Sequence, residues 1–381
     1  MTKMEVLERI RRIAKEPYAS ALHWKKAEKR RVLGYYPMDF PEELFYAAGF
    51  VPFAVFGSNL PPTRADAHLQ SFADSLARSF LHHGLAGDLD LLDGLVITHI
   101  DDTTRVLSSI CRDNWQVPFF EDYLPPKRTD TSLARPYFID EIQRLRGQLE
   151  ASCRSSITEE ALDSAIELCD RDRSLLREIN KLRLQSPSLI SNRDFFDAVK
   201  TSVLMPKEDH IDLMEDLLQG MQQKTAGKGA TPQDPLLPIL LTGYVCEPSD
   251  IYDLIDGMNG LIVADDLVSG SRYFERDVPQ GKDPIERIVD RLIGLPPSPF
   301  FLSPASREAF LWDRLRQGGA KGVVFVQLKF CETYNYDYPN LRDFFRKKGI
   351  PTLLIETDLG MTTVSQIHTN LETFFEMIRG I

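Results

Sequence analysis

The sequence predicts an α/β protein with two parallel-sheet units and a helical subdomain between them. Short apolar runs of the kind that form buried parallel strands occur in two groups, one before residue 121 and one after residue 236. Helical spacing separates the runs within each group, and such alternation is typical of a parallel sheet covered by helices. From Pro136 to about Lys224, apolar residues recur at helical spacing without a convincing strand.

These patterns divide the 381 residues into four segments. We expect a basic N-terminal helical arm over 1–33, a first α/β domain over 34–135, a helical subdomain with a linker over 136–235, and a second α/β domain over 236–381. Roughly 150 residues per domain agrees with this division. The linker is the stretch 225–235, which is rich in Gly, Pro and small polar residues.

Each expected element rests on a local pattern. The helix over 41–48 has Pro41 at its start and Gly49 directly after its end. The first domain continues with strand 51–56, helix 68–84, strand 94–100, helix 104–113 and strand 117–120. The second domain has expected strands over 239–245, 261–264, 323–328 and 351–355, and helices over 249–257, 283–293, 305–317, 339–347 and 364–379.

Charge is unevenly distributed along the chain. The net charge is −11, which argues against nucleic-acid binding because phosphate backbones need clustered Lys and Arg. Residues 1–31 carry ten Lys or Arg against four Glu, and Val6, Ile10 and Ile13 share one helical face. This segment either docks on an acidic partner subunit or is an amphipathic first helix with a solvated basic side.

Several common sites are missing from the sequence. No two of the five cysteines are close enough for a CxxC motif, so a metal site must collect ligands distant in sequence. No GxGxxG follows a strand, and GKGATP at 227–232 lacks phosphate-loop spacing, so we expect no ATP in this chain. The longest apolar stretch, Leu236 to Val245, is too short to cross a membrane, and the first residues lack a signal-peptide core. We therefore expect a cytoplasmic protein.

Polar residues follow the strands at the sheet edges where ligands of parallel sheets bind. These strand-end groups include Asp101, Asp102, Cys246, Glu247, Asp265, Asp266, Lys329, Cys331, Glu356 and Asp358. As a set they predict a cleft lined by thiol and carboxylate groups, although any single Asp is explained as a helix cap. His99, at the end of its strand, is either a proton donor or a hydrogen-bonded core residue. His82 and His83 are expected to form a surface pair.

Six segments together carry a family resemblance. They are GYYPMDFPEELFYAAGFVP (34–52), DAHLQSFADSLARS (66–79), VITHIDDTTRVL (96–107), GLIVADDLVSGSRYFE (260–275), GVVFVQLKFCETYNYDYPNLRDFF (322–345) and GIPTLLIETD (349–358). In order and spacing they resemble the 2-hydroxyacyl-CoA dehydratase and benzoyl-CoA reductase family. The chain length is closest to the smaller cluster-type subunit (gamma/C-like) of class I ATP-dependent benzoyl-CoA reductases.

The resemblance implies two flavodoxin-like, Rossmann-type units and a hetero-oligomeric oxidoreductase. Its expected partners are a paralogous larger subunit, ATPase subunits that activate electrons, ferredoxin as electron donor, and an acyl-CoA substrate. Such complexes use an oxygen-sensitive [4Fe–4S] cluster and serve anaerobic aromatic degradation. Asp265, Asp266 and Arg272 match the family stretch DD-x-x-x-G-x-R, which implies that they lie near the acyl-CoA.

The family's cluster motif is altered in this chain. Members usually provide three cysteines, but Asp74 and Asp101 stand at the first two positions and Cys331 alone is kept. Because thiolates suit iron–sulfur clusters far better than carboxylates do, we expect the partner subunit to hold the cluster. The resemblance implies a subunit of an ATP-dependent aryl-CoA reductase that dearomatises the ring. The alternatives are a subunit of a 2-hydroxyacyl-CoA dehydratase and a cluster-free scaffold subunit.

Overall fold

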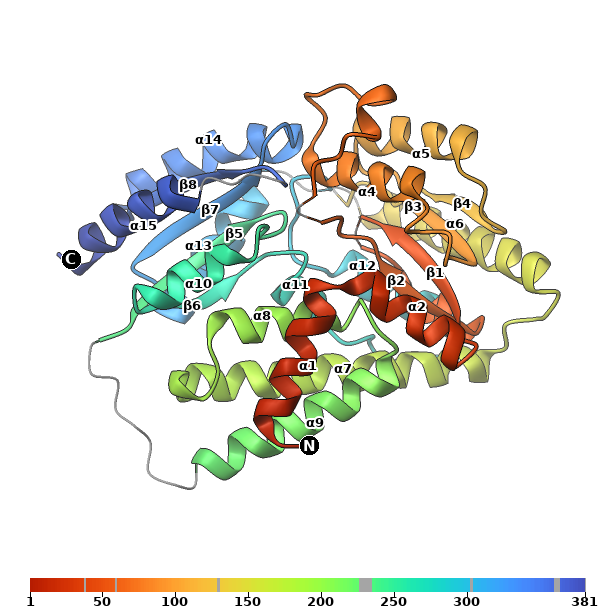
Figure 1. The fold of residues 1–381 in the computed structure, drawn as a ribbon, viewed down its shortest axis with the longest axis horizontal. Coiled ribbons are helices and arrows are strands. Elements are labelled where there is room, and N and C mark those ends of the chain that lie inside the picture. The colour runs from red at the N-terminus through yellow and green to blue at the C-terminus, as the bar shows by residue number, and fades with distance from the viewer. Residues whose placement is uncertain are drawn as a thin grey trace.

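The computed structural model contains two parallel four-stranded sheets, as the sequence predicts. Figure 1 shows the sheets side by side, with the helices of the middle of the chain packed below both. The structure describes residues 1–37, 39–58, 60–128, 131–225, 235–301, 304–359 and 364–380. Most of the expected linker, residues 226–234, lies outside the described residues. The four segment boundaries stay a prediction.

The first sheet has the strand order β2-β1-β3-β4. Its strands are β1 (Arg31–Tyr36), β2 (Phe50–Ala54), β3 (Gly94–Thr98) and β4 (Phe120–Tyr123). The sequence patterns gave β2 and β3 with small shifts and placed β4 too early, but they missed β1, which pairs with both β2 and β3. Arg31 and two tyrosines break the apolar run of β1, and the basic stretch before it conceals where the sheet begins.

The second sheet repeats the same topology, in the order β6-β5-β7-β8. Its strands are β5 (Leu237–Gly243), β6 (Gly260–Asp265), β7 (Gly322–Leu328) and β8 (Thr352–Thr357). All four were predicted within two residues at each end. The runs are easy to recognise because central strands of a parallel sheet are buried on both faces, and β7 is buried at every position.

Helices cover both faces of each sheet (Figure 1). Around the first sheet lie α3 (Glu42–Ala47), the short 3₁₀ helix η1 (Ala65–Ala67), α4 (Ser75–Ala86), α5 (Asp102–Asn114) and the start of α6 (Thr131–Cys153). Around the second sheet lie α10 (Asp250–Gly257), α11 (Ser271–Phe274), α13 (Pro304–Gly318), α14 (Glu332–Lys347) and α15 (Val364–Arg379), whereas α12 (Pro284–Ile293) packs on α6. The expected helix 68–84 begins later, because Asp74 caps α4 and the residues before it form turns.

The middle of the chain is helical, as predicted. Its elements are α7 (Glu159–Gln185), η2 (Pro187–Leu189), α8 (Asn192–Thr201) and α9 (Lys207–Thr225). The N-terminal helices α1 (Lys3–Lys15) and α2 (Pro17–Ala27) precede the first sheet. Helix α1 packs on α8 and α9, with Val6, Ile10 and Ile13 buried (Figure 1). The predicted apolar face of the basic segment is therefore covered within the chain itself.

No described helix combines the length and the apolar character needed to cross a membrane.

Candidate functional site

Three residues that follow strands mark the start of three helices. Asp74 caps α4, Asp101 caps α5, and Cys331 is the residue directly before α14. Asp74 Oδ1 accepts a hydrogen bond from the Ala77 N–H at 2.9 Å, and Asp101 Oδ1 accepts one from the Thr104 N–H at 2.8 Å. Both carboxylates therefore do the work of ordinary N-caps, which satisfy backbone donors that would otherwise lack partners.

The fold brings Asp74, Asp101 and Cys331 into electrostatic range of one another. Burial raises the pKa of the Cys331 thiol well above its ordinary value, and the charges of Asp74 and Asp101 add to that rise. Burial also raises the pKa of Asp74 to about 7, and the nearby Asp101 again contributes. The pKa of Asp101 is raised for the same main reason. Two residues from the first sheet's helices thus meet one from the second sheet's edge.

Asp265, Asp266 and Arg272 are held by internal bonds. Asp265 accepts hydrogen bonds from the backbone of Leu267 and Ser271, and burial raises its pKa to about 6. Arg272 is 2% exposed and donates to the carbonyl oxygen of Pro296 at 2.5 Å.

Asp266 is paired with a different arginine. Its carboxylate accepts a hydrogen bond from Arg307 at 2.8 Å, and Arg307 also binds Asp337 at 2.6 Å. This geometry accounts for the Asp-Asp motif as a local brace between β6 and its neighbouring helices. A contact with acyl-CoA stays a prediction.

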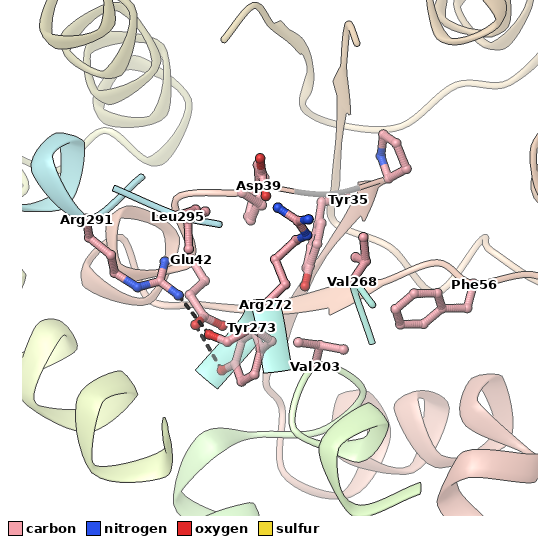
Figure 2. Close-up of a pocket in the computed structure, with 12 residues that line it drawn as sticks. Tyr35, Asp39, Glu42, Phe56, Val203, Val268, Arg272, Tyr273, Arg291 and Leu295 are labelled. Atoms are coloured by element: carbon pink, nitrogen blue, oxygen red, sulfur yellow. Dashed lines mark hydrogen bonds between the residues drawn. The ribbon is translucent and has the colours of Figure 1, made fainter. Parts of the chain in front are cut away.

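A small cavity lies between the two sheets, beside Arg272. Figure 2 shows Arg272 pointing into it from α11, with Tyr273 and Arg291 nearby and Tyr35 on the first-sheet side. The Tyr273 hydroxyl donates to Glu42 at 3.0 Å, one of the bonds drawn in Figure 2. The cavity's volume of about 50 Å³ has room for a few water molecules but not for an acyl-CoA.

A buried ionic cluster lies next to that cavity. Glu42, Glu43 and Cys169 have potential metal-ligand atoms within 4.8 Å of one another. Arg173 already forms ion pairs with both glutamates, and Lys207 lies 3.2 Å from Glu42. Because the carboxylate charges are met by these two cations, the arrangement is explained as a salt-bridge network without an ion.

His99 lies at the end of β3, facing α5. Its Nε2 atom is 3.1 Å from Oδ1 of Asp122, and Asp122 also accepts hydrogen bonds from Ser108 and Arg112. The backbone N–H of His99 donates to the carbonyl of Tyr123 at 2.8 Å. The contact with Asp122 fixes the position of the ring, and the alternative of a hydrogen-bonded core histidine also stays a prediction. A role as proton donor stays a prediction.

The remaining strand-end groups lie in different surroundings. Burial raises the pKa of Cys246, which is 1% exposed. Glu247 pairs with Lys200 from α8, and Glu356 is exposed. Of the expected strand-end groups, Asp101 and Cys331 lie in electrostatic range of each other, and Asp74 joins them. The single cleft lined by thiols and carboxylates stays a prediction.

One expectation about the histidines was wrong. His82 and His83 were expected on the surface, but His83 is 3% exposed and hydrogen-bonds through both ring nitrogens. Neighbouring helix residues point about 100° apart, so one of the pair faces inward when the other faces out. The partners of His83 are Ser58 and Asp88, which no sequence motif marked.

Comparison with known proteins identifies the family of this chain. Residues 37–378 match the family model described as "2-hydroxyglutaryl-CoA dehydratase, D-component". The chain belongs to this family. The match spans the helical middle, the whole second sheet and the first sheet except β1, which ends at Tyr36.

Members of this family with curated names are similar along nearly the whole chain. The beta subunit of (R)-phenyllactyl-CoA dehydratase from Clostridium sporogenes is 25% identical over 92% of each chain. The beta subunit of (R)-2-hydroxyglutaryl-CoA dehydratase from Acidaminococcus fermentans is 26% identical, over 98% of this chain and 99% of its own. One subunit of benzoyl-CoA reductase from Thauera aromatica is 24% identical over 95% of each chain. Both dehydratases and a reductase therefore occur among the relatives.

The family's expected iron–sulfur cluster does not fit the donors in this member. A cluster needs deprotonated sulfur ligands, whereas the three positions hold one thiol and two carboxylates. The thiol of Cys331 is 4% exposed with a raised pKa, and Asp74, with a pKa of about 7, is only partly ionised at neutral pH. Both aspartates are also committed to helix capping. We therefore derive no chemistry from a cluster in this chain.

Proposed function

We propose that this chain is a subunit of an ATP-dependent, low-potential aryl-CoA reductase of the benzoyl-CoA type. In this proposal a paralogous larger subunit holds the [4Fe–4S] cluster, and separate ATPase subunits deliver electrons from ferredoxin in the cytoplasm. The assignment of the cluster to the partner subunit rests on the side chains at the three expected cluster positions, which are Asp74, Asp101 and Cys331. The similarity to the benzoyl-CoA reductase subunit along 95% of each chain supports the reductase assignment.

The second candidate is a subunit of a 2-hydroxyacyl-CoA dehydratase. It is favoured by the two dehydratase beta subunits, which are as similar to this chain as the reductase subunit is. The two candidates differ in electron use, because a dehydratase recycles its electron and a reductase consumes electrons with every turnover. They also differ in the partner that is expected, since the reductase needs two ATPase chains and the dehydratase a homodimeric activator.

The proposal is tested by anaerobic co-purification of this chain with its natural partners. Identification of the partner chains and assays with benzoyl-CoA and with 2-hydroxyacyl-CoA separate the two candidates. Net reduction of an aryl-CoA with ATP hydrolysis supports the reductase. Dehydration of a 2-hydroxyacyl-CoA without net electron consumption replaces it with the second candidate. A chain that purifies alone as a stable monomer contradicts both.

A cysteine substitution tests where the cluster lies. Cys331→Ser is expected to leave the iron content of the whole complex unchanged, because the thiol at this position lacks the two companions that a cluster needs. The matched control is the corresponding Cys→Ser change in the partner, which should abolish the bound iron. Loss of about four irons per complex from Cys331→Ser alone would show a cluster in this chain, with Asp74 and Asp101 as its further ligands.

A further inference from the structure

A serine, a histidine and an aspartate form a hydrogen-bonded chain near the C-terminal end of α4. The Ser58 hydroxyl lies 2.8 Å from Nε2 of His83, and Nδ1 of His83 lies 2.7 Å from Oδ2 of Asp88. A carboxylate only accepts hydrogen bonds, so Nδ1 carries the proton that faces Asp88. In the neutral ring Nε2 is then an acceptor, and the Ser58 hydroxyl donates to it.

This chain of bonds borders the largest cavity described near the N-terminal helices. Ser58, His83 and Asp88 all line a space of about 780 Å³, enclosed by α2, the loop after β2 and the residues that follow α4. Its volume lies within the range typical of small-molecule sites, and most of its wall is apolar. Three lysines and three acidic residues also line it: Lys15, Lys25, Lys26, Glu16, Asp88 and Asp90. The balanced charges favour a neutral ligand over an ionic one.

The loop that carries the serine is fixed on the same helix. The Ser58 N–H donates to the Ser79 hydroxyl at 2.9 Å. Ser79 lies one helical turn before His83 on α4, so this bond holds the backbone of Ser58 close to His83. Gly57, directly before Ser58, has a φ of 69°, and a side chain there would approach the Ser79 hydroxyl to 2.6 Å. The Leu60 N–H donates to the Ser58 hydroxyl at 3.2 Å.

We propose that Ser58, His83 and Asp88 form a second active site, which hydrolyses carboxylic esters of small apolar acyl groups. A nucleophile, a base in hydrogen-bond reach and a third group that orients the base are the arrangement that serine acyl transfer requires. Ser58 and His83 are the catalytic residues, and Asp88 is a positioning residue. The site is independent of the function proposed above, because the family's cluster positions lie at the other end of α4 or beyond it.

The reaction needs water as its co-reactant and involves no net oxidation. The Ser58 oxygen bonds to the ester carbonyl carbon while its proton passes to Nε2 of His83. The carbon–oxygen bond to the leaving alcohol then breaks, and the alcohol takes that proton. Water attacks the acyl-serine with His83 again as base, which releases the carboxylic acid and restores Ser58. The Leu60 N–H, which donates to the Ser58 hydroxyl, holds that oxygen in place beside His83.

Labelling of the unaltered chain is the first test. The full-length protein, with its partner if they co-purify, is treated with a fluorophosphonate, and the modified residue is mapped by peptide mass spectrometry. We expect one label per chain on Ser58 and hydrolysis of p-nitrophenyl butyrate that the label abolishes. An unlabelled Ser58, under conditions that fully label a known serine hydrolase, would overturn the proposal. This test needs no variant, so a misfolded mutant cannot obscure it.

Paired variants give the second test. His83→Gln is expected to lower kcat for ester hydrolysis by roughly 100-fold or more, whereas His82→Gln, its neighbour, should stay within about 2-fold. Ser58→Ala should abolish hydrolysis, with Ser20→Ala as its control. Asp88 is 47% exposed, so Asp88→Asn should lower kcat by only about 10-fold and leave KM nearly unchanged, with the exposed Asp113→Asn, outside the cavity, as control. Activity that persists in Ser58→Ala, or equal losses in both histidine variants, would overturn the proposal.

Discussion

The carboxyl edges of the two sheets carry similar pairs of acidic residues but neutralise them differently. At the second sheet, Asp266 is paired with the buried Arg307, 2.8 Å away, and lies 3.8 Å from Arg272. At the first sheet, the hydrogen bonds that the structure describes for the side chains of Asp74 and Asp101 come from the first turns of the helices that they cap. The second edge therefore has a salt-bridge brace at Asp266, although burial also raises the pKa of Asp265 beside it to about 6, whereas at the first edge burial raises the pKa of both carboxyls.

This difference distinguishes acidic residues whose charge is paired within the fold from acidic residues whose charge is left unpaired. An acid that is fully paired with arginine is explained by the fold itself, since a buried charge must be paired to be tolerated. An acid with a pKa raised to about 7, like Asp74, costs stability in its ionised form, and its role in the fold is the cap that it provides to α4. The family resemblance places Asp74 at an expected cluster-ligand position, and that position stays a prediction.

The largest effect is expected from breaking the brace at the second sheet. Arg307→Ala leaves Asp266 and Asp337 buried without their cation and should lower the free energy of unfolding by about 3–5 kcal/mol. Equilibrium denaturation measures the loss. Arg342→Ala is the control, because the exposed pair of Arg342 and Asp343 should contribute less than about 1 kcal/mol. Equal effects of the two changes would remove the distinction between the brace and a surface pair.

A smaller, pH-dependent effect is expected at Asp74. The unfolded carboxyl loses its proton near its ordinary pKa of 3.8, whereas the folded one keeps it up to about 7. Asp74 therefore makes the chain less stable as the pH rises from about 4 to about 7. Asp74→Asn, which keeps a capping side chain, should be nearly neutral at pH 4 and should raise the free energy of unfolding at pH 8 by on the order of 2–4 kcal/mol.

Denaturation at several pH values checks this expectation. The exposed Asp102→Asn is its control, and it should show no comparable dependence on pH. If Asp74→Asn destabilises the chain equally at pH 4 and pH 8, the carboxylate is needed in its ionised form and the first sheet resembles the second after all.

The smallest effect is expected at Asp101, where capping is the main role. Asp101→Ala should lower the free energy of unfolding by about 1 kcal/mol, because the Thr104 N–H at the start of α5 loses its acceptor. Asp101→Asn keeps an acceptor for this N–H and should lower the free energy of unfolding by only a few tenths of 1 kcal/mol. A loss well above 2 kcal/mol in thermal or chemical denaturation would mean that Asp101 makes a further contact of larger energy.

The comparison also shows which parts of the fold a sequence can predict. Strands β5 to β8 were found because they are short apolar runs, and strand–helix alternation predicted that they form a parallel sheet, but their order in the sheet was not predicted. Strand β1 was missed even though it lies in the middle of its sheet, since Arg31, Tyr35 and Tyr36 give it a mixed pattern. In such a strand, burial is decided by the neighbouring elements and not by the residues alone.

The candidate sites show the same limit, because a residue is predictable only where a sequence pattern marks it. The group of Asp74, Asp101 and Cys331 was named in advance because short motifs mark each residue, although their separation in sequence exceeds 250 residues. Ser58, His83 and Asp88 carry no motif, and only the packing of a loop against α4 brings them together. A histidine pair on a helix gives a weak signal, because its members point about 100° apart and can have different environments.

The ionic cluster around Glu42 affects how the chain unfolds. It joins α3 of the first unit to Arg173 and Lys207 in the helical middle, and Tyr273 of the second unit hydrogen-bonds to the same glutamate. Detaching α3 from the helical middle would leave buried charges uncompensated, and detaching the second unit would remove the Tyr273 hydrogen bond. Local fraying is thereby suppressed at the junction, so hydrogen exchange there should report global unfolding, and the units should not behave as separable modules when excised.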